Sequence, residues 1–288
     1  MKVYIMTDLE GVCGVNGRGD GIGNKIINTE NACHLLTEEV NAAVDGLVDA
    51  GAKEIIVVDG HGGSNSIQIE NLHPRAKLEI IGGGLCPVTY YLDNSYAAYM
   101  QIGAHAMQGT ATGFMNHTFN SHSIANMWLN DTPVGEIAIG SLCAAYFGVP
   151  AILISGDRAA CKEAVDFLGK VETVETKVAS ARYTVVNRSP LEVRQELRKV
   201  SARAFANRDK YPVKKIAAPY QLKIQFMCPN QADDYERRGA RRLDHQTVIL
   251  QSGDFIDLLA QNSGWAPGIH NPRFEIMPAG KRKLKQNI

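Results

Sequence analysis

The sequence predicts an α/β fold, with a mainly parallel sheet covered by helices on both faces and a smaller C-terminal α+β domain. Short apolar runs typical of strands buried on both sides alternate with segments whose apolar residues recur every three or four positions. Near residue 170 the composition changes, and segments rich in β-branched and basic residues follow. We therefore expect a larger domain over residues 1–170 and a smaller one over residues 171–288.

The first half contains five predicted strands, which are the apolar runs at 3–6, 53–60, 76–81, 97–103 and 150–156. Helical periodicity lies between them, at 30–50, 134–148 and 158–169. Because strand, helix and strand follow one another closely, the connections favour a parallel sheet. The Gly-rich segment GRGDGIG at 17–23 is predicted to be a mobile loop.

The second half predicts a different mixture of elements. The segment at 171–186 is rich in β-branched residues, and 221–228 and 245–251 are further strand candidates. Ser189, Pro190 and Glu192 form the pattern of a capping box with proline at the first helical position, so a helix is expected from there to about residue 207. A closing helix is expected over 254–261.

The composition excludes several classes of protein. The chain has 288 residues, 45% of them hydrophobic and 21% charged, and its formal net charge is +0, so no overall field attracts nucleic acid or an anionic membrane. We found no apolar run near the roughly 18 residues of a membrane span, and Asp8 comes too early for a signal peptide. The six cysteines are scattered without a C-x-x-C pair, which indicates reduced thiols and a cytoplasmic protein.

Two carboxylates follow the first predicted strand. Asp8 and Glu10 lie two positions apart, so in an extended backbone their side chains point to the same side. The carboxyl ends of parallel strands border the ligand crevice in folds of this class. Carboxylates held close together repel each other, and a divalent cation between them is the simplest way to keep both ionised.

Other residues that commonly bind metals follow later predicted elements. The second strand ends in Asp59 and His61, and His105 follows the run at 97–103. Glu136 lies in the first turn of a predicted helix, where the helix dipole also favours an anion. Asp59 either orients His61 or caps its own turn.

The combined set of candidate ligands is Asp8, Glu10, His61, His105 and Glu136. Mixed carboxylate and imidazole ligands suit zinc, with manganese or cobalt as substitutes. Five ligands exceed what one catalytic zinc needs, because such an ion keeps a position open. They fit two metal ions that share a bridging carboxylate, typically about 3.5–4 Å apart.

Five motifs occur together in the order and approximate spacing of a known family: TDLEG at 7–11, VDGH at 58–61, GAHA at 103–106, MNHT at 115–118 and PVGE at 133–136. With these motifs the sequence resembles the DppA-type D-aminopeptidases, the zinc peptidases of family M55. The segment at 148–164 is also similar to that family. The resemblance covers roughly the first 170 residues, whereas the loop from Val15 to Lys25 and the C-terminal segment are dissimilar.

The resemblance implies two zinc ions per subunit. Asp8 would bridge them, Glu10 and His61 would complete one metal site, and His105 and Glu136 would complete the other. The catalytic histidine of the family falls on His117, as acid/base or as nucleophile. The resemblance also implies a homo-oligomer, a decamer of two stacked pentamers.

The expected activity is therefore that of a zinc-dependent aminopeptidase, which releases the N-terminal residue, D-amino acids included, from short peptides. A metal-dependent amidase for a non-peptide or modified-peptide amide would use the same residues and stays open, as does a metal-binding protein without catalysis. A cysteine hydrolase with Cys13 as nucleophile is a further alternative. Phosphate loops at 17–23 or at IGGGL (81–85) lack the usual Lys-Ser/Thr ending.

Overall fold

The computed structural model describes residues 1–21, 23–62, 65–81, 91–264, 274–277 and 281–284. Its largest sheet has seven strands in the order β11-β10-β9-β6-β1-β4-β5. All neighbours run parallel except β11, which is antiparallel to β10. The strands are β1 (Lys2–Thr7), β4 (Glu54–Asp59), β5 (Ala76–Ile80), β6 (Tyr96–Ala104), β9 (Ala151–Asp157), β10 (Glu172–Ala181) and β11 (Thr184–Asn187).

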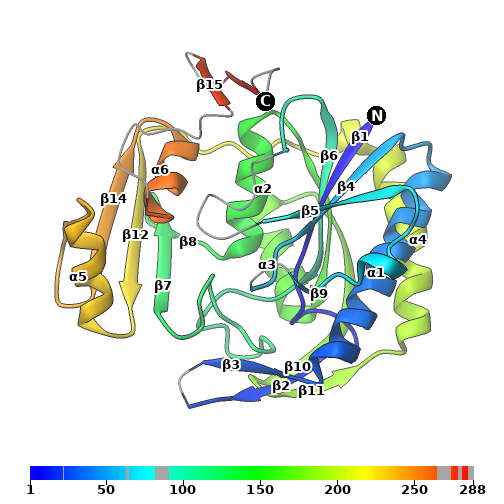
Figure 1. Cartoon of the computed structure of the whole chain (residues 1–288), viewed down its shortest axis with the longest axis horizontal. Helices are drawn as coiled ribbons and strands as arrows, with labels where there is room; N and C mark the ends of the chain where they lie inside the picture. The colour runs from blue at the N-terminus through cyan, green and yellow to red at the C-terminus, as the bar shows by residue number, and fades with distance from the viewer. Residues whose placement is uncertain (22, 63–64, 82–90, 265–273, 278–280, 285–288) are drawn as a thin grey trace.

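Helices cover both faces of this sheet (Figure 1). On one face α1 (Thr29–Asp49) and α4 (Pro190–Ala206) pack against each other and enclose Val3 and Ile5 of β1. On the other face α2 (Glu136–Tyr146) and α3 (Arg158–Leu168) share a core with Tyr4 and Met6. Successive residues of β1 thus enter opposite cores, as the pleat of a strand requires. The predicted α/β class is confirmed.

A second sheet of five antiparallel strands lies beside the first, in the order β13-β14-β12-β7-β8. Its strands are β7 (Ile124–Leu129), β8 (Thr132–Pro133), β12 (Tyr220–Phe226), β13 (Arg241–Arg242) and β14 (Thr247–Ser252), with α5 (Pro229–Arg237) and α6 (Phe255–Asn262) beside them. Leu222 and Ile224 of this sheet belong to the same apolar cluster as Ile137 of α2. One apolar cluster therefore joins the second sheet to α2, and Figure 1 shows the two side by side.

Each of the two sheets contains strands from both sides of residue 170. Strands β7 and β8 come from the first part of the chain but belong to the second sheet, whereas β10, β11 and α4 come later and complete the first. The proposed division at residue 170 stays a prediction. Helix α4 begins where it was expected, but the side chain of Ser189 makes no capping hydrogen bond, and Glu192 pairs instead with Arg188 at 2.7 Å.

The Gly-rich segment differs from its prediction. Part of the segment is paired, because β2 (Asn16–Gly19) and β3 (Asn24–Ile27) form an antiparallel hairpin, and its mobility stays a prediction. A Cβ at Gly17 would lie 1.9 Å from Sδ of Met115, so glycine is needed here for close packing and not for turn conformation. The remaining elements are the 3-10 turns η1 (Ile69–Asn71) and η2 (Arg208–Lys210) and the pair β15 (Phe274–Met277) and β16 (Lys281–Leu284).

The strand order fixes where a ligand can bind. From β1 the chain moves to β4 and β5 on one side and then returns to β6 on the other side of β1. Ligands of open α/β sheets bind at such a reversal, outside the carboxyl ends of the strands. The residues that follow β1, β4 and β6 therefore border the expected ligand-binding site.

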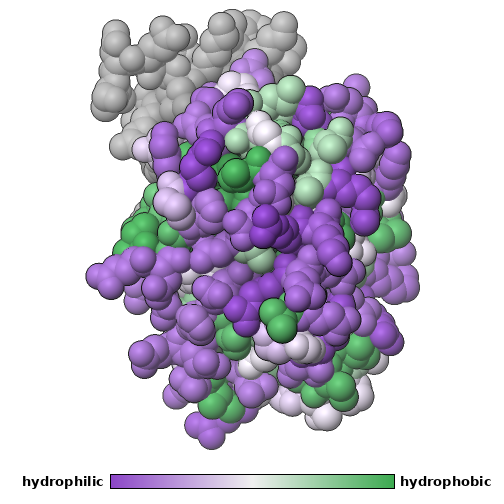
Figure 2. Space-filling model, turned by 90° about the vertical axis from the view of Figure 1, so that its right-hand side faces the viewer, coloured by the Kyte–Doolittle hydropathy of each residue, from purple (hydrophilic) through white to green (hydrophobic). Residues whose placement is uncertain are grey.

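The outer surface over α1 and α4 is mainly hydrophilic, with apolar side chains in small separate groups (Figure 2). Within the described residues, none of the helices combines the length and apolarity needed to cross a bilayer.

Candidate metal centre

The ends of β1 and β6 approach each other closely. The amides of Asp8 and Gly11 donate to the carbonyls of Ile102 and Gly103, both at 2.8 Å. A Cβ at Gly11 would lie 1.9 Å from the carbonyl oxygen of Ala104, and one at Gly103 would lie 2.0 Å from that of Asp8. Only glycine fits at both positions, and Gly103 also has a φ of +79°. These two glycines bring Asp8 and His105 together.

The carboxylate of Asp8 lies between two imidazoles. Its Oδ1 is 3.0 Å from Nδ1 of His61, and its Oδ2 is 3.0 Å from Nε2 of His105. Glu10 Oε2 is also 3.0 Å from Nδ1 of His61. Each oxygen of Asp8 therefore faces a different histidine, which is the arrangement expected of a carboxylate shared by two cations.

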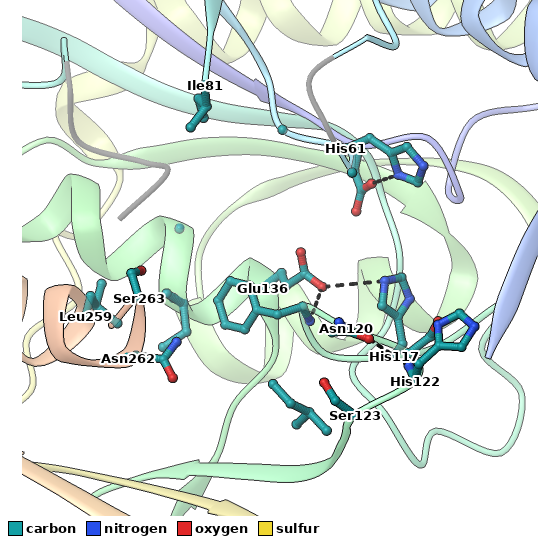
Figure 3. Close-up of a pocket in the computed structure, with 18 of the residues that line it drawn as sticks. His61, Ile81, His117, Asn120, His122, Ser123, Glu136, Leu259, Asn262 and Ser263 are labelled. Atoms are coloured by element: carbon teal, nitrogen blue, oxygen red, sulfur yellow. Dashed lines mark hydrogen bonds and ion pairs between the residues drawn. The ribbon is translucent and has the colours of Figure 1, made fainter. Parts of the chain in front are cut away.

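Glu136 closes the other side of the cluster. It is the first residue of α2, and its Oε1 accepts a hydrogen bond from the amide of Phe119 at 2.6 Å. The same oxygen lies 3.3 Å from Nε2 of His105 and 3.9 Å from Nε2 of His117. Figure 3 shows the carboxylate of Glu136 pointing toward His117, with His61 above them on the same side of the pocket.

The clustered carboxylates favour positive charge on the histidines beside them. Burial alone would lower the pKa of His61, but Glu10 and Asp8 outweigh it and raise that pKa to about 11. The pKa of His105 is raised well above its usual value for the same reason, because Asp8 and Glu136 outweigh its burial. Burial would raise the pKa of Asp8, yet His105 and His61 hold it well below its ordinary value. Bound cations would supply this positive charge in place of protons.

The donor atoms fit metal ions. Among the described residues, the buried atoms Glu10 Oε2 and His105 Nε2 are assigned no hydrogen bond, and their neighbours at 3.0 Å are Nδ1 of His61 and Oδ2 of Asp8. Ligand atoms within 4.8 Å of one another come from two groups, Asp8, Glu10 and His105 in one and His105, His117 and Glu136 in the other. Buried atoms that face a common centre without pairing suit coordination by a borderline metal such as zinc. The second group includes His117, for which the family resemblance implies a catalytic role.

The two ring nitrogens of His117 face different partners. Its Nδ1 lies 3.0 Å from the carbonyl oxygen of Met115, to which it donates, and its Nε2 faces Glu136. The ring stacks on that of His105, with centroids 3.9 Å apart. Asn24 of β3 donates to the same carbonyl at 2.6 Å. Asn24 therefore helps to fix the loop that presents His117.

Four of the candidate ligands, Asp8, Glu10, His61 and Glu136, line a cavity of about 660 Å³. Met6, Tyr99 and Gln101 of the large sheet form part of its floor, beneath Ile139 and Gly140 of α2. The far wall comes from α5 and α6, and Figure 3 shows Leu259, Asn262 and Ser263 on the side opposite the histidines. The cavity thus joins the metal centre to the second sheet and has room for a small peptide.

Comparison with known proteins agrees with this geometry. A family model described as Peptidase_M55, D-aminopeptidase, matches residues 1–261. The chain belongs to the M55 peptidase family. A D-aminopeptidase of Bacillus subtilis (strain 168) is 31% identical over 237 residues, which are 81% of this chain and 84% of the relative. The solved structure of "Zn-dependent D-aminopeptidase DppA from Bacillus subtilis, a self-compartmentalizing protease" has a TM-score of 0.82 at 29% identity and covers 91% of this chain and 95% of its own.

Membership of the M55 family makes the chain an aminopeptidase, a hydrolase. The alternative of a cysteine hydrolase is disfavoured by geometry as well. Cys13 is 1% exposed, and burial, with the charge of Glu39, raises the pKa of its thiol to about 11. A thiol of this kind is a poor nucleophile near neutral pH.

Asp59, a candidate from the sequence, and His122 both hold neighbouring segments in place. Asp59 Oδ2 accepts hydrogen bonds from the amides of Ser66 at 2.6 Å and Ile67 at 3.0 Å, so Asp59 caps its turn. His122 Nε2 lies 2.8 Å from Oδ2 of Asp20, which ties the β2–β3 hairpin to the loop after His117. The segment 81–85 lies, beyond Ile81, outside the described residues.

Sequence reasoning missed a buried lysine of this M55 chain. Lys177 on β10 is fully buried, and its Nζ donates to the carbonyls of Glu10 at 2.8 Å and Val15 at 3.0 Å. Thr176 donates to the next carbonyl, that of Gly11. Both side chains reach the same loop because β10 has a register shift between Glu175 and Lys177. The only sequence signal for this buried contact was a lysine within a segment rich in β-branched residues.

Two further carboxylates hold the loop between His105 and His117. Asp157 Oδ2 accepts from the amide of Phe114 at 2.7 Å, while its Oδ1 caps α3 through Ala160 at 2.9 Å. Glu163 Oε2 accepts from the amide of Met107 at 2.7 Å. These contacts give Asp157 and Glu163 a positioning role.

Proposed function

We propose that the chain is a zinc-dependent aminopeptidase with two zinc ions per subunit, which releases the N-terminal residue of short peptides, D-residues included. The observation that supports two ions best is the position of Asp8, whose two oxygens lie 3.0 Å from two different histidines. In this proposal Asp8 is shared, Glu10 and His61 complete one site, and His105 and Glu136 complete the other. The name of the M55 family and its relatives supports a peptide substrate.

The protein residues have separate tasks in this proposal. Bound zinc would polarise the scissile carbonyl and make a water molecule more acidic. His117 is proposed to be the catalytic residue, because Nδ1–H is held by Met115 and Nε2 faces the cluster. It can exchange a proton with the reacting groups at Nε2. Glu136 is held by the amide of Phe119, so it offers its oxygen at a fixed position.

The proposed assembly and location of the protein follow from its relatives and its thiols. We propose a homo-oligomer, and specifically a decamer, supported by the description of the Bacillus subtilis structure as a self-compartmentalizing protease. Light scattering in solution should then give a mass close to ten times the 31.4 kDa of one chain. A cytoplasmic location stays a prediction, consistent with the unpaired thiols of Cys13, Cys33, Cys161 and Cys228.

The function is tested with a panel of dipeptides that carry matched D- and L-residues at the first position. Protein freed of metal by a chelator should be inactive, and zinc should restore the release of the first residue. Peptides with a blocked amino terminus should not be cleaved. Hydrolysis of blocked amides at the rate of free peptides would instead identify a general amidase.

A further inference from the structure

Two buried polar groups on the floor of the cavity have no partner. Tyr99 is fully buried and Gln101 is 3% exposed, and both line the cavity. Within the part of the chain that the structure describes, neither the Tyr99 hydroxyl nor Oε1 of Gln101 has a hydrogen-bond partner. Buried polar groups of native proteins are nearly always paired with protein, water or ligand. Because both residues line the cavity, a group that enters it is a candidate for the missing partner.

One further cavity-lining atom is buried and unpaired, and it belongs to the candidate metal centre. Among the described residues that line the cavity, the buried unpaired atoms are Glu10 Oε2, the Tyr99 hydroxyl and Gln101 Oε1. Glu10 Oε2 lies 3.0 Å from His61 within the metal centre. Tyr99 and Gln101 belong to the middle of β6, so they need a different explanation.

The position of these two residues is set by β6 and α2. Tyr99 pairs with Tyr4 and Gln101 with Met6 of β1, so both point to the face covered by α2. A Cβ at Gly140 of α2 would lie 2.4 Å from the Tyr99 hydroxyl. Gly140 follows Glu136 by one helical turn, a rise of about 5–6 Å. Tyr99, Gln101 and Glu136 line the same cavity, so a side chain of a substrate bound at Glu136 is a candidate partner for the two unpaired groups.

We propose that Tyr99 and Gln101 form a subsite for an uncharged, hydrogen-bonding side chain on the first residue of the peptide. This inference rests on the proposed peptidase function. A hydroxyl and an amide can each donate and accept, so they match the amide side chains of Asn and Gln. Met6, Ile81 and Ile139 supply apolar walls along the way.

The charge of the site argues for a neutral group. Glu136 lies one turn away on α2, and a carboxylate side chain in the subsite would be repelled by it. Arg238, just after α5, also lines the cavity, but its guanidinium lies over the ring of Tyr235 and donates to the carbonyl of Asp234. A site built to hydrogen-bond a substrate group discriminates strongly against the isostere that lacks it.

The experiment compares isosteric first residues, Asn with Leu and Gln with Met, each followed by Ala and each in both configurations. For zinc-loaded wild-type protein the kcat/KM of the amide peptide should exceed that of its isostere by about tenfold or more. The Asn/Leu ratio should fall toward one in Tyr99→Phe and in Gln101→Met. Tyr96→Phe is the matched control, because Tyr96 lies on the same strand and packs edge-on against Tyr4 without lining the cavity. Its Asn/Leu ratio should match wild type.

A binding measurement separates failure of the subsite from failure of the peptidase function. Asn and Leu, as free amino acids, are titrated into the zinc-loaded protein by calorimetry. Preferred binding of Asn with no turnover of any peptide would reject the peptidase function and support the subsite. Equal binding and equal turnover of Asn and Leu would overturn the subsite. A preference that survives in Tyr99→Phe and Gln101→Met would also overturn it, since these groups would then only hold a water molecule.

Discussion

His117 and Asn24 share one acceptor, the carbonyl oxygen of Met115. Nδ1 of His117 lies 3.0 Å from this oxygen and Nδ2 of Asn24 lies 2.6 Å from it. Tyr183 in turn donates to Oδ1 of Asn24 at 2.9 Å, which fixes the orientation of the amide. The hairpin that carries Asn24 therefore contributes to the orientation of His117, although its sequence suggested only a mobile loop.

Replacing Asn24 by Ala should slow catalysis while the zinc content stays at the wild-type value. Without the amide, His117 is less firmly held with Nε2 toward the cluster, so kcat should fall by up to about 10²-fold, the lower end of what an acid–base group contributes. Steady-state kinetics and metal analysis of the same preparation measure both quantities.

The control for this change is Asn16→Ala, because Asn16 is an exposed residue of the same hairpin. It should leave kcat unchanged. Loss of zinc from Asn24→Ala would contradict the account, since the residue would then support the metals and not His117 alone.

Replacing Lys177 by Met should weaken zinc binding. The substitution removes the donor to the carbonyls of Glu10 and Val15 and leaves two buried acceptors unpaired. Supporting residues of this kind typically contribute about 10- to 100-fold in metal affinity. Competition with a chromogenic chelator measures the change. Lys162→Met, at an exposed site on α3, serves as control, and equal zinc affinity in both variants would exclude the supporting role.

Glu79 should make the stability of the folded protein depend on pH. This residue of β5 is 6% exposed and accepts a hydrogen bond from Tyr4 at 2.8 Å, and burial raises its pKa from 4.5 to about 7. Because the folded pKa is the higher one, the folded protein binds the proton more tightly between these values. Stability from this group is complete below pH 4.5 and is lost as the pH rises toward 7.

Glu79→Gln should therefore stabilise the protein at high pH. The amide resembles the protonated acid, so the free energy of unfolding should rise by about 1–3 kcal/mol at pH 8 and by less at pH 5. Urea unfolding at both pH values tests this. Glu70→Gln, at an exposed position, should change neither value. A gain at Glu79 that is equal at pH 5 and pH 8 would show that ionisation is not its cause.

Chelation and alkylation should affect the enzyme differently. Dialysis against a chelator should abolish hydrolysis, and zinc should restore it. Iodoacetamide should modify the exposed Cys228 but leave activity, because Cys13 is buried and its pKa is raised to about 11. Cys13→Ala should keep most of the activity. Inactivation by alkylation that zinc cannot reverse would favour the cysteine alternative.

Local sequence patterns predict those elements in which the pattern directly reflects burial in the fold. The apolar run before Asp8 and the periodicity of α1 and α2 both reflect burial, so the first sheet, its helices and the clustering at its carboxyl edge could be predicted. Glu136 was predictable because a helix start favours an acid.

Long-range packing explains what could not be predicted. Gly17 is small because Met115 lies against it, which no local pattern reveals. Lys177 reaches Glu10 only through an irregular register in β10. Gln101 looked like an ordinary residue of a strand, and a polar side chain in the apolar run 97–103 was its only signal. The exchange of β7 and β10 between the sheets likewise depends on tertiary contacts.

The most direct test is the number of zinc ions per chain in wild type and in Asp8→Ala, measured by plasma mass spectrometry after equilibrium with zinc. Asp166→Ala, at an exposed site on α3, is the matched control. We predict close to two zinc ions per chain in wild type and in the control, and loss of both zinc and hydrolysis in a folded Asp8→Ala protein. Two ions and full hydrolysis in Asp8→Ala would contradict the shared-carboxylate centre.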